Sequence, residues 1–256
     1  MAKTVLITGS TSGIGLGIAR EFAAAGCNIA FNGLEPDGAA IAQQVADEFE
    51  IKHTFSPANV MFPDQIRQMI SEAIAAFGGI DVLVNNAGIQ FVSPVEDFPE
   101  DKWDSIIAIN LTAAFHAIKA VWSSMKENHF GRIINIASAH GLRASAFKSA
   151  YVASKHGLIG LSKTIALEGA PFGITCNAIC PGYSETKSVV DQIPNQALVH
   201  HMTEQEVKDK IFLERHAVKE FIPVSLIAKA AYFLAANEAA TITGIALPVD
   251  AGWTAH

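Results

Sequence analysis

The sequence predicts an α/β protein in which helices cover both faces of a parallel β-sheet. Short apolar runs of strand length recur along the 256 residues, segments with helical periodicity separate them, and a glycine-rich turn directly follows the first run. Strands that alternate with helices form βαβ units, whose right-handed crossovers place helices on both sides of the sheet. The expected fold class is therefore a Rossmann-like, doubly wound parallel sheet.

The first half of the chain contains four strand–helix pairs. Strands are expected at 4–8 (TVLIT), 28–32 (NIAFN), 52–56 (KHTFS) and 80–88 (IDVLVNNAG). These runs are shorter than a typical helix, and glycine or polar turn residues bound them. Helices, with apolar residues repeating every three to four positions, are expected at about 14–26, 36–50, 63–77 and 101–128.

The second half continues the alternation but contains one interruption. Strands are expected at 131–138, 174–182 and 244–252, with a helix at 149–170. Residues from about 184 to 222 show no strand pattern and predict two amphipathic helices. An insertion at the carboxyl end of a strand often covers a site, so we expect a helical substrate lid here. The alternative is a helical pair that is only peripheral.

Composition excludes several classes of protein. Hydrophobic residues make up 50 % and charged residues 17 % of the chain, so a large core can form and disorder is not expected. The net charge of −7, without a basic run, argues against nucleic acid or an anionic membrane as a partner. No apolar run approaches the ~20 residues of a membrane span, and the N-terminus does not resemble a signal peptide. Three cysteines without a framework suggest a reducing compartment, and no metal site is expected.

A glycine-rich loop joins the first strand to the first helix. Glycines stand at positions 9, 13 and 15 of the stretch TGSTSGIG. They allow a tight turn and a close approach of the backbone to a pyrophosphate, and the helix N-terminus adds N–H donors. The spacing differs from the commoner G-x-G-x-x-G, and a bare structural turn is the alternative. The position between a strand and a helix favours dinucleotide binding.

The end of the second strand indicates which dinucleotide is used. Asn32 is followed by Gly33, Leu34 and Glu35, and neither this stretch nor the glycine loop contains Arg or Lys. A 2′-phosphate would need such a cation, and Glu35 would repel it. NAD is therefore expected rather than NADP.

Four further motifs follow in order along the chain. They are Asn-Asn-Ala-Gly at 85–88, Asn110 in the long helix, Ser138 at a strand end, and Tyr151 four residues before Lys155. On a helix, positions i and i+4 share one face, so the phenol and the ammonium would point the same way. Taken singly, each motif could have a purely structural role, such as a serine that caps a helix or a Tyr–Lys pair on the surface. Together with the glycine loop, they resemble the short-chain dehydrogenase/reductase family over almost the whole chain.

This resemblance implies roles for four residues. Tyr151 would be the general acid/base and Lys155 its partner, which also holds the nicotinamide ribose. Ser138 would orient the substrate oxygen, and Asn110 would hold a water on a proton path from Lys155. A free phenol titrates near ~10, and a nearby ammonium is expected to lower that pKa so that the phenolate can accept the proton of an alcohol.

The resemblance also implies an NAD site drawn from segments far apart in the sequence. Residues 1–256 would form a single dinucleotide-binding catalytic domain that includes the lid. The expected cofactor-binding residues are Gly9, Thr11, Ser12, Gly13, Ile14, Gly15, Leu34, Asn59, Val60, Asn86, Ala87, Gly88, Tyr151, Lys155, Pro181, Gly182 and Thr186.

Within the family, the similarity is greatest to dehydrogenases of short 3-hydroxy acids. It rests on NNAGIQ, GRIINIASAHGL, KSAYVASKHG, ITCNAICPG and the terminal GWTA. It implies the interconversion of (R)-3-hydroxybutyrate and acetoacetate by a cytoplasmic homotetramer. The substrate carboxylate would be bound by Gln90, His140, Lys148 and Gln192. A cation with several donors in a tight pocket suits such a group.

Some positions depart from the family pattern, and other functions stay open. Asn59 replaces a usual aspartate, Tyr183 a common tryptophan, and Glu185 and Ser188 make the base of the lid more polar. Another small hydroxy acid or a secondary alcohol is therefore an alternative substrate. A dinucleotide-binding regulator without catalysis is a further alternative, against which the complete catalytic set argues. A methyltransferase would have no use for the Tyr–Lys pair.

Overall fold

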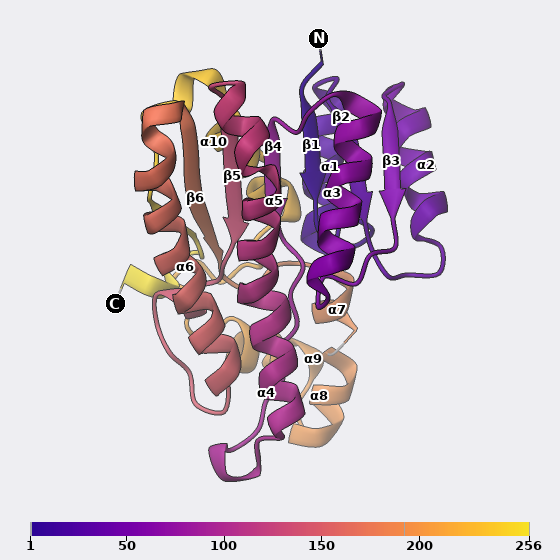
Figure 1. Ribbon diagram of the computed structural model, residues 1–256. Coiled ribbons are helices and arrows are strands. Elements are labelled where there is room, and N and C mark those ends of the chain that lie inside the picture. Colours follow the sequence, from indigo (N-terminus) through magenta and orange to yellow (C-terminus); the bar gives the residue numbers. More distant parts are fainter. Residues whose placement is uncertain (1, 192, 256) are drawn as a thin grey trace.

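One parallel sheet forms the centre of the molecule (Figure 1). The computed structural model describes residues 2–191 and 193–255. Its seven strands lie in the order β3-β2-β1-β4-β5-β6-β7, and all six neighbouring pairs are parallel. The strands are β1 (Thr4–Ile7), β2 (Asn28–Asn32), β3 (His53–Ser56), β4 (Val82–Asn85), β5 (Gly131–Ile136), β6 (Ile174–Pro181) and β7 (Ala246–Val249). The predicted fold class is confirmed.

Helices cover both faces of this sheet, as Figure 1 shows. One face carries α1 (Gly13–Ala24), α2 (Gly38–Phe49) and α10 (Val224–Ala235). The other carries α3 (Pro63–Phe77), α5 (Ala113–Glu127) and α6 (Ser149–Gly169), and α4 (Glu100–Ile107) extends this layer beyond the carboxyl ends of the strands. Alternate residues of each strand point to opposite faces, so Val82 and Val84 join the core under α1 and α10, and Leu83 joins the core under α3 and α5. Burial on both faces explains the continuous apolar runs of the central strands.

The order of the strands reverses between β1 and β4. From β1 the chain winds outward to β2 and β3, then crosses back to β4 and winds toward β7. The loops after β1 and β4 therefore diverge at the carboxyl edge of the sheet and leave a crevice between them. In open α/β sheets, ligands bind at such a switch point.

Helices α4 and α5 form one long helix interrupted by a π-helical turn at Ala108–Thr112. The continuous segment Glu100–Glu127 is long and apolar enough to cross a membrane by length and composition. However, it packs against α3 and α6 over the sheet, and this packing accounts for apolar residues such as Ile118, Val121 and Met125. The helix is therefore explained as part of the layered core.

The insertion near residues 184–222 is helical but does not form the two amphipathic helices that the sequence predicted. It contains α7 (Lys187–Val190), α8 (Ile193–His200), α9 (Glu204–Val207) and a π-helical turn at Lys208–Phe212. Thr203 starts α9 with a capping box: its hydroxyl accepts from the Glu206 N–H, and the Glu206 carboxylate accepts from the Thr203 N–H. The capping box starts a new helix at Glu204 and so separates α9 from α8. In Figure 1 these helices lie beyond the carboxyl ends of the strands.

Candidate active site

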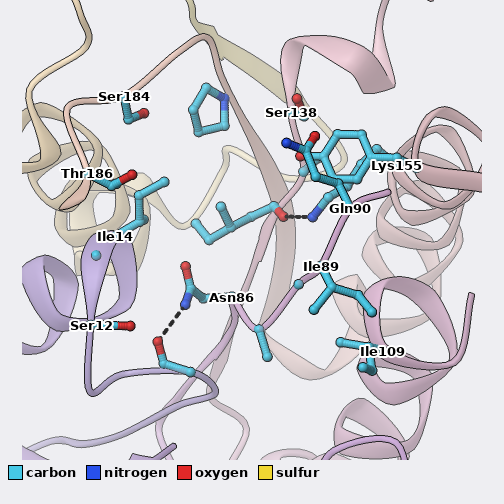
Figure 2. A pocket seen from close by; sticks show the side chains of 18 of the residues that line it. Ser12, Ile14, Asn86, Ile89, Gln90, Ile109, Ser138, Lys155, Ser184 and Thr186 are labelled. Atoms are coloured by element: carbon cyan, nitrogen blue, oxygen red, sulfur yellow. Dashed lines mark hydrogen bonds between the residues drawn. The ribbon is translucent and has the colours of Figure 1, made fainter. Parts of the chain in front are cut away.

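A cleft of about 950 Å³ opens at the carboxyl edge of the sheet. It runs from the loop after β2, past the loops after β1 and β4, to the end of β5, the start of α6 and the residues after β6. Figure 2 shows labelled side chains from both ends, with Ser12, Ile14 and Thr186 in one part and Gln90, Ser138 and Lys155 in another. The cleft coincides with the switch point and is elongated, as a dinucleotide requires.

The glycine loop borders the cleft with backbone rather than with side chains. Gly9 and Gly13 have φ values of 62° and 52°, in the left-handed region that favours glycine. A Cβ on Gly15 would lie 2.0 Å from the Gly9 carbonyl oxygen, so this glycine closes the turn against the strand. Ser12, the N-cap of α1, does not cap the helix with its side chain. The N–H groups at the start of α1 therefore border the cleft, which fits a cofactor pyrophosphate.

A buried asparagine holds the loop after β2 against the glycine loop. The Asn32 side chain accepts from the Gly9 N–H at 3.1 Å and donates to the carbonyls of Ser56 and Ala58 at 3.1 and 2.8 Å. It thereby ties together β1, β2 and β3, whose ends form this part of the cleft. No local pattern in the sequence indicated this role for Asn32.

Glu35 is fixed beside the glycine loop by two hydroxyl groups. Its carboxylate accepts from the Thr11 hydroxyl and from the Ser12 hydroxyl, the latter at 2.9 Å. Partial burial acts to raise the pKa of Glu35, but hydrogen bonds from these hydroxyls and from the backbone of Leu34 and Glu35 outweigh it, and the pKa is lowered. Glu35 therefore places a carboxylate anion at the cleft wall.

Ser138, Tyr151 and Lys155 converge on the cleft from the end of β5 and the first turns of α6. The Ser138 hydroxyl hydrogen-bonds the Tyr151 phenol and also accepts from the His140 N–H at 3.1 Å. The Lys155 ammonium donates to the Ile136 carbonyl at 2.8 Å and lies 5.6 Å from the centroid of the Tyr151 ring. A phenol, a hydroxyl and an ammonium thus meet at one wall, as acid/base chemistry on an alcohol or ketone requires.

The expected lowering of the Tyr151 pKa is not found. Burial is the largest influence and raises the pKa of the phenol, and the Ser138 hydrogen bond opposes this only in part. Burial also lowers the pKa of Lys155 to about 8. The reason is that desolvation is the largest influence on both groups, while the ammonium donates to a backbone carbonyl.

Asn110 lies in the π-helical turn between α4 and α5 and does not line the cleft. Its side-chain oxygen accepts from the Ile89 N–H at 2.9 Å, and its nitrogen donates to the Ile89 carbonyl and the Ser154 hydroxyl at 2.9 and 3.2 Å. Protein groups therefore engage both polar atoms, and the amide fixes the loop after β4 against α6. The role in a proton path stays a prediction.

The predicted carboxylate-binding residues meet beside the phenol, except for one that lies outside the described residues, Gln192. Gln90, His140 and Lys148 all line the cleft. Burial, followed by the charges of Lys148, Arg215 and His156, lowers the pKa of His140 to about 3. His140 is therefore neutral near pH 7, and its Nε2 lies 3.0 Å from the Ser145 hydroxyl. Lys148, which lines the cleft here, carries a positive charge at this end, and Arg215 lies near enough to act on His140 as well.

Most of the predicted cofactor residues line the cleft, and two lie behind it. Thr11 is buried with its hydroxyl on Glu35, and Gly15 packs against Gly9. The Asn59 side-chain oxygen accepts from the Met61 N–H at 3.0 Å and so shapes its own turn. The predicted residues that do line the cleft are Gly9, Ser12, Gly13, Ile14, Leu34, Asn59, Val60, Asn86, Ala87, Gly88, Tyr151, Lys155, Pro181, Gly182 and Thr186.

Two aromatic residues in the cleft wall had no predicted role. Tyr183 and Trp253 stack with ring centroids 5.9 Å apart and planes 7° apart, and the His140 ring meets Trp253 edge-on at 4.7 Å. For Tyr183 the only indication in the sequence was that it replaces a tryptophan common in the family. For Trp253 the terminal GWTA stretch contributed to the resemblance but indicated no contact.

Comparisons with known proteins agree with this geometry. A family model described as short chain dehydrogenase matches residues 3–197. The chain is 51 % identical to the D-beta-hydroxybutyrate dehydrogenase of Rhizobium meliloti, with 100 % of both sequences covered. It is 45 % identical to the enzyme of that name from Cupriavidus necator, with 99 % of this chain and 98 % of the relative covered. Among solved structures, a variant of actinorhodin polyketide ketoreductase with NADPH superimposes with a TM-score of 0.93 at 30 % identity, covering 100 % of this chain and 98 % of the other.

Proposed function

The chain belongs to the short-chain dehydrogenase family, and from this premise we propose that it interconverts (R)-3-hydroxybutyrate and acetoacetate with NAD. The observation that carries the proposal is the position of Lys148 and His140 in the same cleft wall as Ser138 and Tyr151. A substrate whose hydroxyl group and carboxylate are separated by a short carbon chain can bind Lys148 and His140 through the carboxylate while its hydroxyl contacts Ser138 and Tyr151. The relatives named D-beta-hydroxybutyrate dehydrogenase support the same substrate.

The reaction follows from the groups around the phenol. An oxidised nicotinamide bound in the cleft would supply the hydride acceptor and a positive charge that favours the phenolate, which burial disfavours. Ser138 donates to the substrate oxygen, and Tyr151 removes the hydroxyl proton as the carbonyl forms. Lys155, buried beside the phenol, stabilises its negative charge. In the reverse direction Tyr151 returns the proton to the alkoxide.

NAD is proposed over NADP on the position of Glu35. Its carboxylate and the neighbouring hydroxyls of Thr11 and Ser12 form the wall where a 2′-phosphate would need a cation. The solved structure with NADPH belongs to a chain only 30 % identical to this one, so cofactor choice can differ between them. Glu35 would repel the additional phosphate.

We further propose a cytoplasmic homotetramer. The three cysteines are free thiols and buried, which suits a reducing compartment. Large apolar side chains are exposed on helices of both layers, Trp103 and Phe115 on α4 and α5 and Leu226 and Phe233 on α10. A tetramer with dihedral symmetry uses more than one self-complementary interface, and two such surfaces are available here.

The substrate assignment is tested with a panel of hydroxy acids and alcohols. (R)-3-hydroxybutyrate, lactate and 2-butanol are supplied with NAD, and the absorbance of the reduced cofactor is followed. Lys148→Ala removes a charge-assisted hydrogen bond worth roughly 1.5–3 kcal/mol, so kcat/KM for 3-hydroxybutyrate should fall roughly 10- to 150-fold. Lys163→Ala, an exposed lysine on α6 that does not line the cleft, is the matched control.

Two outcomes would contradict the assignment. The wild-type protein could prefer 2-butanol, or Lys148→Ala could slow the turnover of 3-hydroxybutyrate and 2-butanol equally. Either result would leave a dehydrogenase without selection for a carboxylate.

A further inference from the structure

Tyr183, directly after Pro181 and Gly182, lines the cleft together with Lys148 and His140 and packs against two other segments. Its ring stacks on Trp253, and the Phe212 ring meets it edge-on at 5.3 Å with an interplanar angle of 89°. Phe212 belongs to the small hydrophobic cluster of the insertion. The Tyr183 side chain is therefore clamped between the C-terminal segment and the insertion.

A buried histidine fixes the backbone of this tyrosine. The Tyr183 N–H donates to His216 Nε2 at 3.2 Å, and His216 Nδ1 lies 2.9 Å from the Glu220 carbonyl. A carbonyl only accepts and a backbone N–H only donates, so the His216 proton is on Nδ1. The Tyr183 carbonyl accepts from the Ile222 N–H at 2.8 Å. The position of the phenol is thus set by both backbone and ring contacts.

The Tyr183 hydroxyl faces Lys148, and the direction of their hydrogen bond has a consequence. The Lys148 ammonium lies 3.3 Å from the hydroxyl oxygen. An ammonium has donors only, so the phenol accepts this bond and its own O–H proton stays available for another acceptor. Both side chains line the cleft beside His140. An anion bound to Lys148 would therefore lie within reach of a second donor.

We infer that Tyr183 is a specificity-determining residue whose hydroxyl donates to the substrate carboxylate beside Lys148. This inference rests on the proposed function, since it concerns the carboxylate of the same substrate. The phenol adds a donor that neither a phenylalanine nor a tryptophan could supply at the same place. Because stacking and hydrogen bonds hold it in position, little conformational entropy is lost when it binds the carboxylate.

The test compares Tyr183→Phe with the wild-type protein on charged and neutral substrates. Phenylalanine keeps the ring contacts and removes the hydroxyl. KM for (R)-3-hydroxybutyrate should rise roughly 10-fold, as for a lost hydrogen bond to a charged group, with kcat changed less than ~3-fold. Turnover of 2-butanol, if measurable, should stay within ~2-fold of the wild-type value, because it has no carboxylate. Inhibition by butyrate, which binds but cannot react, should weaken by the same factor as KM rises.

Two further variants distinguish a role of the Tyr183 hydroxyl in substrate binding from a purely structural effect of the substitution. Tyr232→Phe removes a phenol that packs on Phe22, away from the cleft, and should change none of these constants. Tyr183→Trp keeps a large ring for stacking on Trp253 but has no hydroxyl at the phenol position, so its KM should rise as in Tyr183→Phe.

The result also distinguishes this inference from the proposed function. If the wild-type protein oxidises 3-hydroxybutyrate and Tyr183→Phe leaves KM and butyrate inhibition unchanged, the inference is overturned while the function stands. Equal losses with 3-hydroxybutyrate and 2-butanol would also overturn it, because they would indicate a general disturbance of the site. If the wild-type protein does not oxidise 3-hydroxybutyrate, both are overturned.

Discussion

At the scale of single residues, Tyr151 must give up its proton in a place where burial disfavours the phenolate. The Ser138 hydrogen bond opposes that effect, and Lys155 lies beside the same ring. Acid/base chemistry at this site therefore depends on groups that the protein holds in place before the substrate arrives.

Removing the phenol hydroxyl tests this dependence. Tyr151→Phe keeps the ring but leaves no group to exchange a proton with the substrate, so kcat should fall at least ~10²-fold. The dissociation constant of NAD, measured by fluorescence titration, should change little, since most of the cleft wall is unaltered. Tyr232→Phe serves as the control. Near-normal turnover by Tyr151→Phe would refute the assignment of the base.

The buried ammonium of Lys155 makes a second prediction that concerns stability and pH. Its pKa of about 8 lies below the ordinary value of 10.5, so the charged lysine destabilises the fold below pH 8. This cost fades as pH rises from 8 toward 10.5, because the folded lysine loses its proton before the unfolded one does. Lys155→Met removes this cost, so its free energy of unfolding should exceed that of the wild type by more at pH 7 than at pH 10.5. The excess should shrink by about 3 kcal/mol between these two pH values.

Urea denaturation of both proteins at equal concentration measures this difference, and effects of pH on groups that do not interact with Lys155 cancel between them. A difference that does not change between the two pH values would show that Lys155 titrates as it does in water.

Glu35 leads to a third prediction at this scale, on cofactor choice. The wild-type kcat/KM with NAD should exceed that with NADP at least ~10-fold, about 1.4 kcal/mol. Glu35→Gln keeps an acceptor for Thr11 and Ser12 but removes the charge, so the preference should shrink. Glu48→Gln, which removes a charge that pairs with Arg20 outside the cleft, should leave it unchanged. Equal use of both cofactors by the wild type would refute the proposed role.

At the scale of elements, the insertion from α7 to the second π-helical turn has its own small core. Ile193, Val207, Phe212 and Leu213 are buried against one another, with Tyr183 at their edge. A bridge between Ser184 and Ile222 joins the two ends of the insertion. A segment with a small core and few anchors opens more easily than the sheet beneath it.

We expect substrate and cofactor to stabilise this insertion together. Trypsin cleavage after Lys208 and Lys210 should slow roughly 10-fold in the presence of saturating NAD and 3-hydroxybutyrate, compared with the free protein. Peptide mapping by mass spectrometry measures the rates, and cleavage after Lys163 on α6 is the internal reference. If both ligands leave the rates in the insertion unchanged, it is a fixed peripheral element and not a lid.

At the scale of the whole molecule, two exposed apolar surfaces lie on different sides of the sheet. Phe115 on α5 and Phe233 on α10 are 45 % and 52 % exposed. These helices cover opposite faces, as Figure 1 shows. A tetramer would bury each surface against its own copy, which removes apolar area from water.

Charge substitutions test the two surfaces separately. Phe115→Glu and Phe233→Glu should each convert the tetramer to a dimer in analytical ultracentrifugation, because a buried unpaired carboxylate is costly. The double variant should sediment as a monomer. Val95→Glu alters a residue that is 78 % exposed outside both surfaces and should leave the tetramer intact. A wild-type monomer at all concentrations would contradict the proposed assembly.

Much of this architecture could be predicted from the chain because its signals are local. The apolar runs at 4–8, 28–32, 131–138 and 174–182 contain strands. A short strand that is buried on both faces is continuously apolar, so it can be predicted without knowing which strands it pairs with. The glycines at positions 9, 13 and 15 lie in the turn before α1, where backbone conformation and close packing require them. Tyr151 and Lys155 lie on one face of α6 because helical spacing places them there.

Other features depended on contacts between distant segments. The stack of Tyr183 on Trp253, the Asn110 hydrogen bonds to Ile89 and Ser154, and the Lys148 bond to Tyr183 join residues that no local pattern relates. The raised pKa of Tyr151 depends on how completely the surrounding chain excludes water, which residue spacing does not report. Residue types and their order could indicate the chemistry, but packing decided which partners meet and how strongly each charge is desolvated.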